Sequence, residues 1–185
     1  MSNFKFAGSA QSDIVPRAGW GSTTGLLTVN NYDRAARQAV NTDITGDPIV
    51  LDIRSVETGF VNFAKGAAPD YRIVPLGSSE LPDRPGKEFT PCVRVRLFHD
   101  EHGLRDLTVT AVSARRAFEQ AIIAWLESDQ AQKGLVPRTS ITAGEITGST
   151  TLVYPPVFSP ATWAQRPEIF GEPTVVLPEM DEVPF

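Results

Sequence analysis

The chain contains few of the side chains that build disulfide frameworks, metal centres and nucleophilic active sites. Among its 185 residues there are two histidines and one cysteine, Cys92. A single cysteine excludes an internal disulfide framework, and a reducing cytoplasm is its natural compartment. The histidines, His99 and His102, flank two acidic residues in what we expect to be a solvated hairpin turn rather than a metal site. No pairing of a nucleophile with a base is recognisable, so we expect a protein that is not an enzyme and needs no metal or cofactor.

Long apolar runs are also absent, and none approaches the ~20 residues that a helix needs to cross a bilayer. The first six residues lack a charged segment followed by an apolar stretch, so we expect no secretory signal. The hydrophobic content of 41% and the ten phenylalanines suffice for a folded core. We expect one domain over residues 1–166, of which residues 1–47 form an N-terminal extension, and a flexible acidic tail over residues 167–185.

Basic residues are missing from the last part of the chain. No Lys or Arg follows Arg166, whereas five acidic residues do. The chain has 17 basic and 22 acidic residues, so residues 1–166 are neutral overall and the net charge of −5 comes from the terminal segment. A neutral body can still carry a local basic surface for nucleic acid, and an acidic segment can compete for that surface.

Short apolar runs separated by Gly and Pro predict a mainly β fold with one helix. The clearest element is a β-hairpin whose arms are residues 92–98 and 104–112. A helix follows from Ser113, with apolar side chains at helical spacing, and ends near Gly134. Other strands are expected at residues 26–29, 49–53, 59–63, 71–74, 136–141 and 150–157, and a short helix at residues 32–40.

This order of strands, hairpin, helix and further strands is that of an OB-fold, a five-stranded barrel that binds single strands on its open face. The order is also compatible with other small α+β domains. Residues 1–47 either complete the barrel or decorate it.

The last six residues, from Met180 to Phe185, have the composition of a peptide that a partner protein recognises. Phe185 suits an apolar slot, while the carboxylates of Asp181, Glu182 and the C-terminus suit basic residues at the rim of that slot. Pro184 restricts the backbone and lowers the entropic cost of binding. The other interpretation is an ordinary disordered acidic terminus.

This ending resembles the acidic C-terminal tip of bacterial and bacteriophage single-stranded DNA-binding proteins, in which a run of Asp precedes Ile-Pro-Phe. Here the acidic run is shortened to two residues, and Val183 stands where Ile is usual. The resemblance covers only the tip. It implies an OB-fold body that coats and protects single-stranded DNA in a bacterial cell. It also implies that the tip recruits replication, recombination or repair proteins through Asp181, Glu182, Val183, Pro184 and Phe185.

Two other functions stay open at this point. One is a phage-encoded adaptor that binds a host replication protein through the same tip without touching DNA. The other is a structural protein whose ending is a coincidence. A homo-oligomer is compatible with all three functions, and the sequence does not separate DNA from RNA as a ligand.

The polar side of the predicted strand at residues 92–98 is the first candidate for DNA contact. Arg94, Arg96 and Phe98 are two residues apart and therefore point the same way. Arginines can follow phosphates while an aromatic ring stacks on an unstacked base. In the alternative interpretation, Phe98 packs under a loop and the arginines pair with nearby acids.

The segment from residue 59 to residue 72 is the second candidate, because aromatic and basic residues alternate along it. Phe60 and Phe63 point to opposite faces of a regular strand, so we expect one of them in the core. The contacts expected from this segment are Phe60, Lys65, Tyr71 and Arg72.

The three tryptophans have different predicted roles. Trp20, in a glycine-rich loop near Arg17, is expected to close over a bound strand, and Tyr154 is a further stacking candidate. Trp125 lies on the apolar side of the predicted helix and is assigned to the core. Trp163 is expected to fix the end of the domain.

Overall fold

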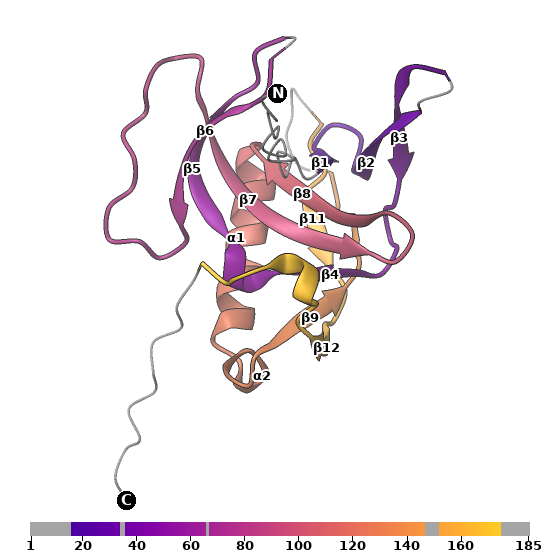
Figure 1. The fold of residues 1–185 in the computed structure, drawn as a ribbon, viewed down its shortest axis with the longest axis vertical. Helices are drawn as coiled ribbons and strands as arrows, with labels where there is room; N and C mark the ends of the chain where they lie inside the picture. Colours follow the sequence, from indigo (N-terminus) through magenta and orange to yellow (C-terminus); the bar gives the residue numbers. More distant parts are fainter. Residues whose placement is uncertain (1–15, 34–35, 66, 147–151, 175–185) are drawn as a thin grey trace, which may run out of the picture.

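The computed structural model describes residues 16–33, 36–65, 67–146 and 152–174. They form a mainly β fold with one main helix, shown in Figure 1. The strands are β1 (Arg17–Gly21), β2 (Leu26–Asp33), β3 (Gln38–Asp43), β4 (Ile49–Leu51), β5 (Glu57–Asn62), β6 (Asp70–Pro75), β7 (Thr90–His99), β8 (Gly103–Val109), β9 (Leu135–Thr139), β10 (Ile141–Ala143), β11 (Pro156–Phe158) and β12 (Thr162–Gln165). The helices are α1 (Val112–Leu126) and α2 (Asp129–Gln132), with 3-10 turns η1 (Ile53–Ser55) and η2 (Glu168–Phe170).

Strand β7 is the centre of a ten-stranded sheet. One edge of β7 pairs with β8, while successive parts of its other edge pair with β4 and β5. The strands run in the order β12-β9-β4-β7-β8-β1-β2-β3, with β6 attached through β5, and β10 and β11 form a separate pair. The described strands at the two ends of this order do not pair with each other, so the sheet is open. The described residues therefore form an open sheet of ten strands where an OB-fold-like barrel of five strands was expected.

The predicted hairpin is confirmed, and so is a helix after it, but α1 ends at Leu126 and the short α2 follows where a single helix was expected to continue. Along β7, Val93, Val95 and Leu97 are buried and alternate with half-buried polar positions. The turn into β8 ends at Gly103, whose φ of 68° favours glycine. In α1 the buried Phe118 and Ile122 are four residues apart and so lie on one side of the helix. No helix among the described residues is long and apolar enough to cross a membrane.

The N-terminal part differs from the prediction in two ways. The helix expected at residues 32–40 is instead the end of a β2–β3 hairpin, because the cross-strand register from Thr28↔Asp43 onward overrides the weak helical pattern. Trp20 does not lie in a loop but in β1, which pairs antiparallel with β2 and parallel with β8. Its side chain is 9% exposed and its indole N–H donates to the Tyr154 carbonyl oxygen at 3.1 Å. Trp20 is thus a core residue.

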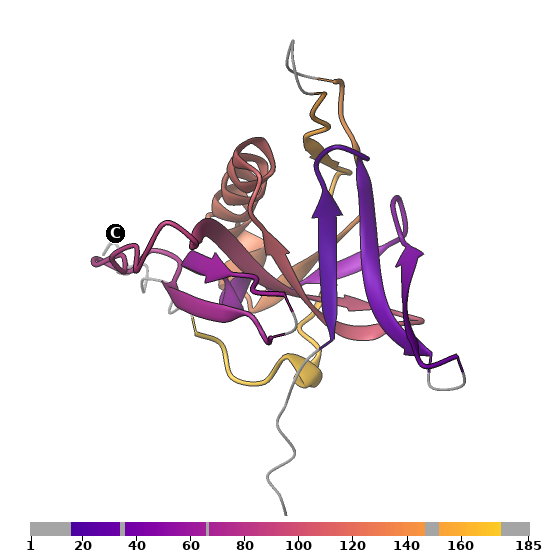
Figure 2. The same cartoon turned by 90° about the horizontal axis from the view of Figure 1, so that it is seen from above.

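The folded body continues beyond residue 166, the expected end of the domain. Arg166 donates to both carboxylate oxygens of the fully buried Asp52, at 2.8 and 2.7 Å. Phe170 is also fully buried, and the backbone N–H of Thr174 donates to the Arg54 carbonyl oxygen at 2.9 Å. Figure 2 shows α1 and this C-terminal segment on opposite sides of the sheet. Residues 166–174 are therefore part of the domain.

The other two tryptophans lie where the sequence placed them. Trp125 and Trp163 are half-buried and pack against the core, and the Trp125 ring contacts Phe158 edge-on at 5.3 Å between centroids. Trp125 thus belongs to the packing between α1 and β11, as the pattern of the helix predicts.

Candidate nucleic-acid interface

The polar side of β7 carries the first group of predicted contacts, and its arginines are held in ion pairs. Arg94 donates to a Glu57 carboxylate oxygen at 3.2 Å and also to Asp106. Its guanidinium lies over the Tyr71 ring, 4.9 Å from the centroid, and the Tyr71 hydroxyl shares a 2.9 Å hydrogen bond with Thr108. Burial lowers the pKa of Arg94, but Asp106 and Glu57 outweigh it and the net effect is a raised pKa.

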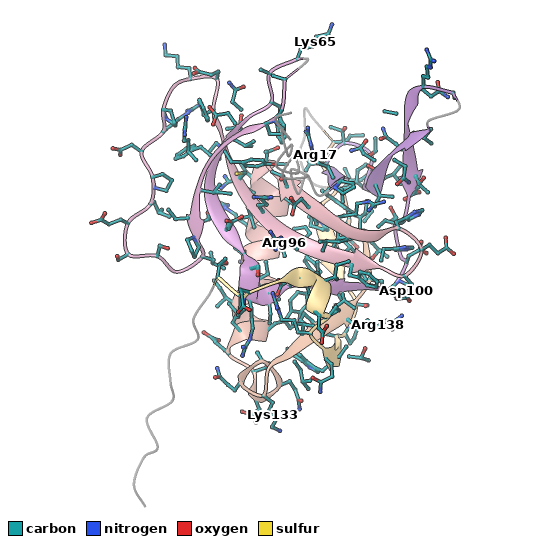
Figure 3. All side chains as sticks on the ribbon, viewed as in Figure 1. Arg17, Lys65, Arg96, Asp100, Lys133 and Arg138 are labelled. Carbon is teal, nitrogen blue, oxygen red and sulfur yellow. The ribbon has the colours of Figure 1, made fainter. Side chains whose placement is uncertain are left out.

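The C-terminal segment lies against the same side of the sheet. Arg96 donates to the Phe170 carbonyl oxygen at 2.7 Å, and its Nε lies 3.8 Å from a carboxylate oxygen of Asp106. Figure 3 shows Arg96 beside this segment. Phe98 is half-buried and packs against the core. Arg94 and Arg96 thus pair with acidic residues, which is the alternative that the sequence left open. Asp106 and Glu57 offset much of the positive charge on this side of the sheet.

A pocket lies next to β5, on the part of the molecule that carries the second group of predicted contacts. Its volume is about 400 Å³, within the range of small-molecule and cofactor sites. We call it the β5 pocket. It is lined by Thr58, Gly59, Phe60, Leu81, Pro82, Asp83, Arg84, Pro91 and Arg115. Four of these side chains are apolar and two are cationic, so the pocket combines the two chemistries that single-strand binding requires.

The outer wall of the β5 pocket is the loop of residues 77–88, which projects from the side of the sheet in Figures 1 and 2. Both ends of this loop are fixed. Leu76 packs against the core and its N–H donates to the Val56 carbonyl oxygen at 2.8 Å. Phe89, at the other end, is buried with 5% exposure. The loop therefore holds its lining residues at a defined place beside β5.

The N-terminus of α1 makes the inner side of the β5 pocket electropositive. Arg115, in the first helical turn, lines the pocket, and Arg116 follows it. Within the described turn no acidic residue is present, and the N-cap residue Ala111 has no side chain that could accept a hydrogen bond from the helix. A helix N-terminus carries a positive partial charge of its own, so this end of α1 favours an anion.

Two further arginines are associated with the β5 pocket, Arg84 in its lining and Arg72 on the strand beside it. Arg84 donates from Nε to the Gly86 carbonyl oxygen at 3.0 Å and from Nη2 to the Lys87 carbonyl oxygen at 2.8 Å, which fixes its guanidinium in the loop. Arg72 is the cross-strand neighbour of Phe60 and pairs with Asp70 at 3.4 Å. Both members of this pair are about half exposed, and such pairs contribute only about 0–1 kcal/mol. A phosphate can therefore replace Asp70 as the partner of Arg72.

The end of the β5–β6 hairpin adds an exposed aromatic ring and two more cations. Phe63 is 49% exposed, and the Arg17 guanidinium lies 5.8 Å from its centroid. Lys65 is exposed at the same end, as Figure 3 shows. The expectation that Phe60 or Phe63 is a core residue is not met, because Val61 takes the buried position on β5 and leaves Phe60 in the pocket.

The structure thus divides the predicted contacts into two groups. Phe60 and Arg72 are neighbours at the β5 pocket, while Tyr71 points the other way and belongs to the ion-pair network of Arg94. Sequence reasoning missed Arg84 and Arg115. The signal for Arg84 is the proline-rich composition around it, since prolines restrict a loop that must hold a side chain in place.

The cysteine and the histidines, which could support covalent or metal chemistry, are not part of the β5 pocket. Burial raises the pKa of the Cys92 thiol to about 11, so the thiol is protonated near neutral pH. His99 is buried and accepts hydrogen bonds from two backbone N–H groups of its own turn. Within residues 16–33, 36–65, 67–146 and 152–174, no group of three His, Cys, Asp or Glu side chains could hold a metal ion.

Comparison with protein-family models, with curated proteins and with solved structures gave no match. The tip, Asp181, Glu182, Val183, Pro184 and Phe185, lies outside the described residues. The geometry of the β5 pocket and the sequence of the tip are therefore the two observations on which a function can be based.

Proposed function

We propose that this protein binds single-stranded DNA through the β5 pocket and its basic surroundings, and that its C-terminal tip recruits a second protein. The observation that supports the proposal best is a half-buried phenylalanine, Phe60, in a pocket lined by two arginines and opposite a third on the neighbouring strand. Arg72 comes from β6, Arg84 from the loop and Arg115 from α1. Cations positioned around an aromatic ring match the repeating phosphates and bases of a single strand.

The fold contributes to this proposal in a more limited way. A hairpin followed by a helix that packs back on the sheet is an arrangement shared with OB-fold domains, and we include an OB-like ancestry in the proposal. The proposed role is to coat and protect single strands during replication or recombination in the cytoplasm of a bacterial host. Arg94 and Arg96 are secondary contacts in this scheme, because their ion pairs would have to open before they met phosphates. Phe98 is secondary because it packs against the core.

We expect the double variant R84A/R115A to bind oligo-dT more weakly and with a smaller salt dependence than the natural protein. Each phosphate contact on a single strand contributes ~0.7 to the slope of log K against log salt, so losing two contacts lowers the slope by about 1.4. Fluorescence anisotropy with labelled oligo-dT at a series of salt concentrations measures both quantities.

The matched control is K133A/R138A, which removes the same charge from residues outside the lining of the β5 pocket; both are labelled in Figure 3. Thermal unfolding of both variants verifies that each retains its fold. If the two double variants show the same slope, the β5 pocket is not the phosphate-binding site. If the natural protein ignores oligo-dT at low salt, the DNA-binding function itself is wrong.

The tip is tested separately by deleting Phe185. We expect the deletion to abolish recruitment of a replication, recombination or repair protein while oligo-dT binding is retained, since Phe185 supplies the apolar anchor of the tip. Pull-down from a bacterial lysate, with K133A/R138A as control, measures recruitment. An adaptor that does not touch DNA is the alternative function. It would show tip-dependent recruitment but no oligonucleotide binding in any variant.

A further inference from the structure

The β5 pocket has one carboxylate among its lining side chains, that of Asp83. Asp83 lies in the pocket lining directly before Arg84. Within the described residues, the Asp83 carboxylate takes part in no hydrogen bond or ion pair. Asp83 is exposed on the loop, so its carboxylate is a solvent-accessible acceptor that a ligand in the pocket can reach.

The other polar side chains of the lining are donors, and several of them are already engaged. Arg84 donates to two backbone carbonyl oxygens of its own loop. Arg115 donates from Nε to the Thr110 carbonyl oxygen at 3.3 Å, and the Thr58 hydroxyl donates to the Cys92 carbonyl oxygen at 3.5 Å. Asp83 therefore carries the one charged acceptor among the lining side chains. A base that binds to the Asp83 carboxylate must therefore offer N–H groups as hydrogen-bond donors.

The four bases differ in what their pairing edges offer to a carboxylate. Guanine presents two adjacent donors, the ring N1–H and the exocyclic N2 amine, which can bind both oxygens of one carboxylate. Cytosine and adenine each present one amine beside a ring acceptor. Thymine presents a single N–H between two carbonyl oxygens, which the carboxylate repels. In a single strand these edges are free to be read in this way.

We propose that the β5 pocket binds one unstacked guanine, with Phe60 against the ring and the Asp83 carboxylate across the N1–H and N2 amine. This inference rests on the proposed function and adds a base preference to it. Arg84 and Arg115 hold the neighbouring phosphates, and Leu81, Pro82 and Pro91 complete the apolar walls. The protein then coats single strands generally but holds guanine-containing strands more tightly than oligo-dT.

The experiment compares equal lengths of a d(GT) repeat, a d(IT) repeat and oligo-dT, with inosine in place of guanine in the second. Inosine lacks the N2 amine and is otherwise guanine. We expect the natural protein to bind the d(GT) repeat about tenfold more tightly than oligo-dT, the scale of a good bidentate contact, and to lose most of that advantage with d(IT).

The variant D83A should bind the d(GT) and d(IT) repeats equally, and it should bind oligo-dT more tightly than the natural protein because a negative charge beside the phosphates is gone. The matched control is E80A, which removes one negative charge from the same loop outside the pocket lining and should keep the tenfold ratio. Equal binding of all three oligonucleotides by the natural protein, or an unchanged ratio in D83A, overturns the guanine site and leaves the proposed function standing. Absence of binding to any oligonucleotide overturns both.

Discussion

Replacing Arg166 by alanine should lower the free energy of unfolding by about 3–5 kcal/mol, the cost of leaving a buried charge without its partner. The Asp52 carboxylate is fully buried and receives two hydrogen bonds from the Arg166 guanidinium. Arg166 also donates to the Gly171 carbonyl oxygen at 2.6 Å and lies over the Phe170 ring, 5.5 Å from the centroid. Its loss therefore also releases the segment that covers the polar side of β7. Denaturant unfolding followed by circular dichroism measures the change.

The control for this variant is R138A. Arg138 pairs with Asp100 at 2.9 Å, but their side chains are 44% and 66% exposed. Exposed pairs of this kind contribute about 0–1 kcal/mol. A loss in R166A no larger than the loss in R138A would show that the pair with Asp52 does not hold the C-terminal segment in place.

We expect G59A to destabilise the fold by about 2–6 kcal/mol and to abolish binding at the β5 pocket. Gly59 has a φ of 150°, and a Cβ at this position would lie 2.2 Å from the Arg72 carbonyl oxygen and 2.9 Å from the Ile73 Cα. Backbone strain and a clash with the neighbouring strand each cost about 1–3 kcal/mol. The backbone of β6 must move away, and this displaces Arg72 from its place beside Phe60. Denaturant unfolding and oligonucleotide titration measure the two effects.

The variant G77A measures the cost of backbone strain without the steric clash that G59A adds. Its φ is 89°, but a Cβ there would meet nothing within 4 Å. G77A should therefore show the strain alone, about 1–3 kcal/mol, and retain more of the oligonucleotide binding than G59A. Equal binding by G59A and the natural protein would exclude the pairing of β5 with β6 as a requirement for the site.

The sequence predicted best those helices and strands whose burial pattern can be read from neighbouring residues. The alternation of Val93, Val95 and Leu97 fixes the hairpin, and the spacing of Phe118 and Ile122 fixes the helix, because burial on one side is visible in consecutive residues. The sequence contained no such local pattern to show that the sheet is open. Whether the sheet is open depends on which edge of β7 accepts β4 and β5, and pairing across many residues leaves no local signal.

The candidate site shows the same division. Phe60 and Arg72 could be named from the mixture of aromatic and basic residues in one short segment. Arg84 and Arg115 could not, because a loop and a helix bring them to β5 from elsewhere in the chain.

The arginines of β7 illustrate the opposite error. Alternation correctly gives the direction of Arg94 and Arg96 but not their partners. Asp106 comes from the next strand and Glu57 from a strand much earlier in the chain. The direction of a side chain therefore does not show whether its charge is available to a ligand.

The pairing of Asp52 with Arg166 also has a consequence for synthesis of the chain on the ribosome. The two residues are 114 positions apart, so the carboxylate emerges long before its guanidinium partner has been translated. Until then, closure of the core around η1 would strand an uncompensated charge in an apolar environment. The last steps of folding must therefore wait until Arg166 has left the exit tunnel, and shortened translation products that stop before Arg166 should be substrates for chaperones and proteases.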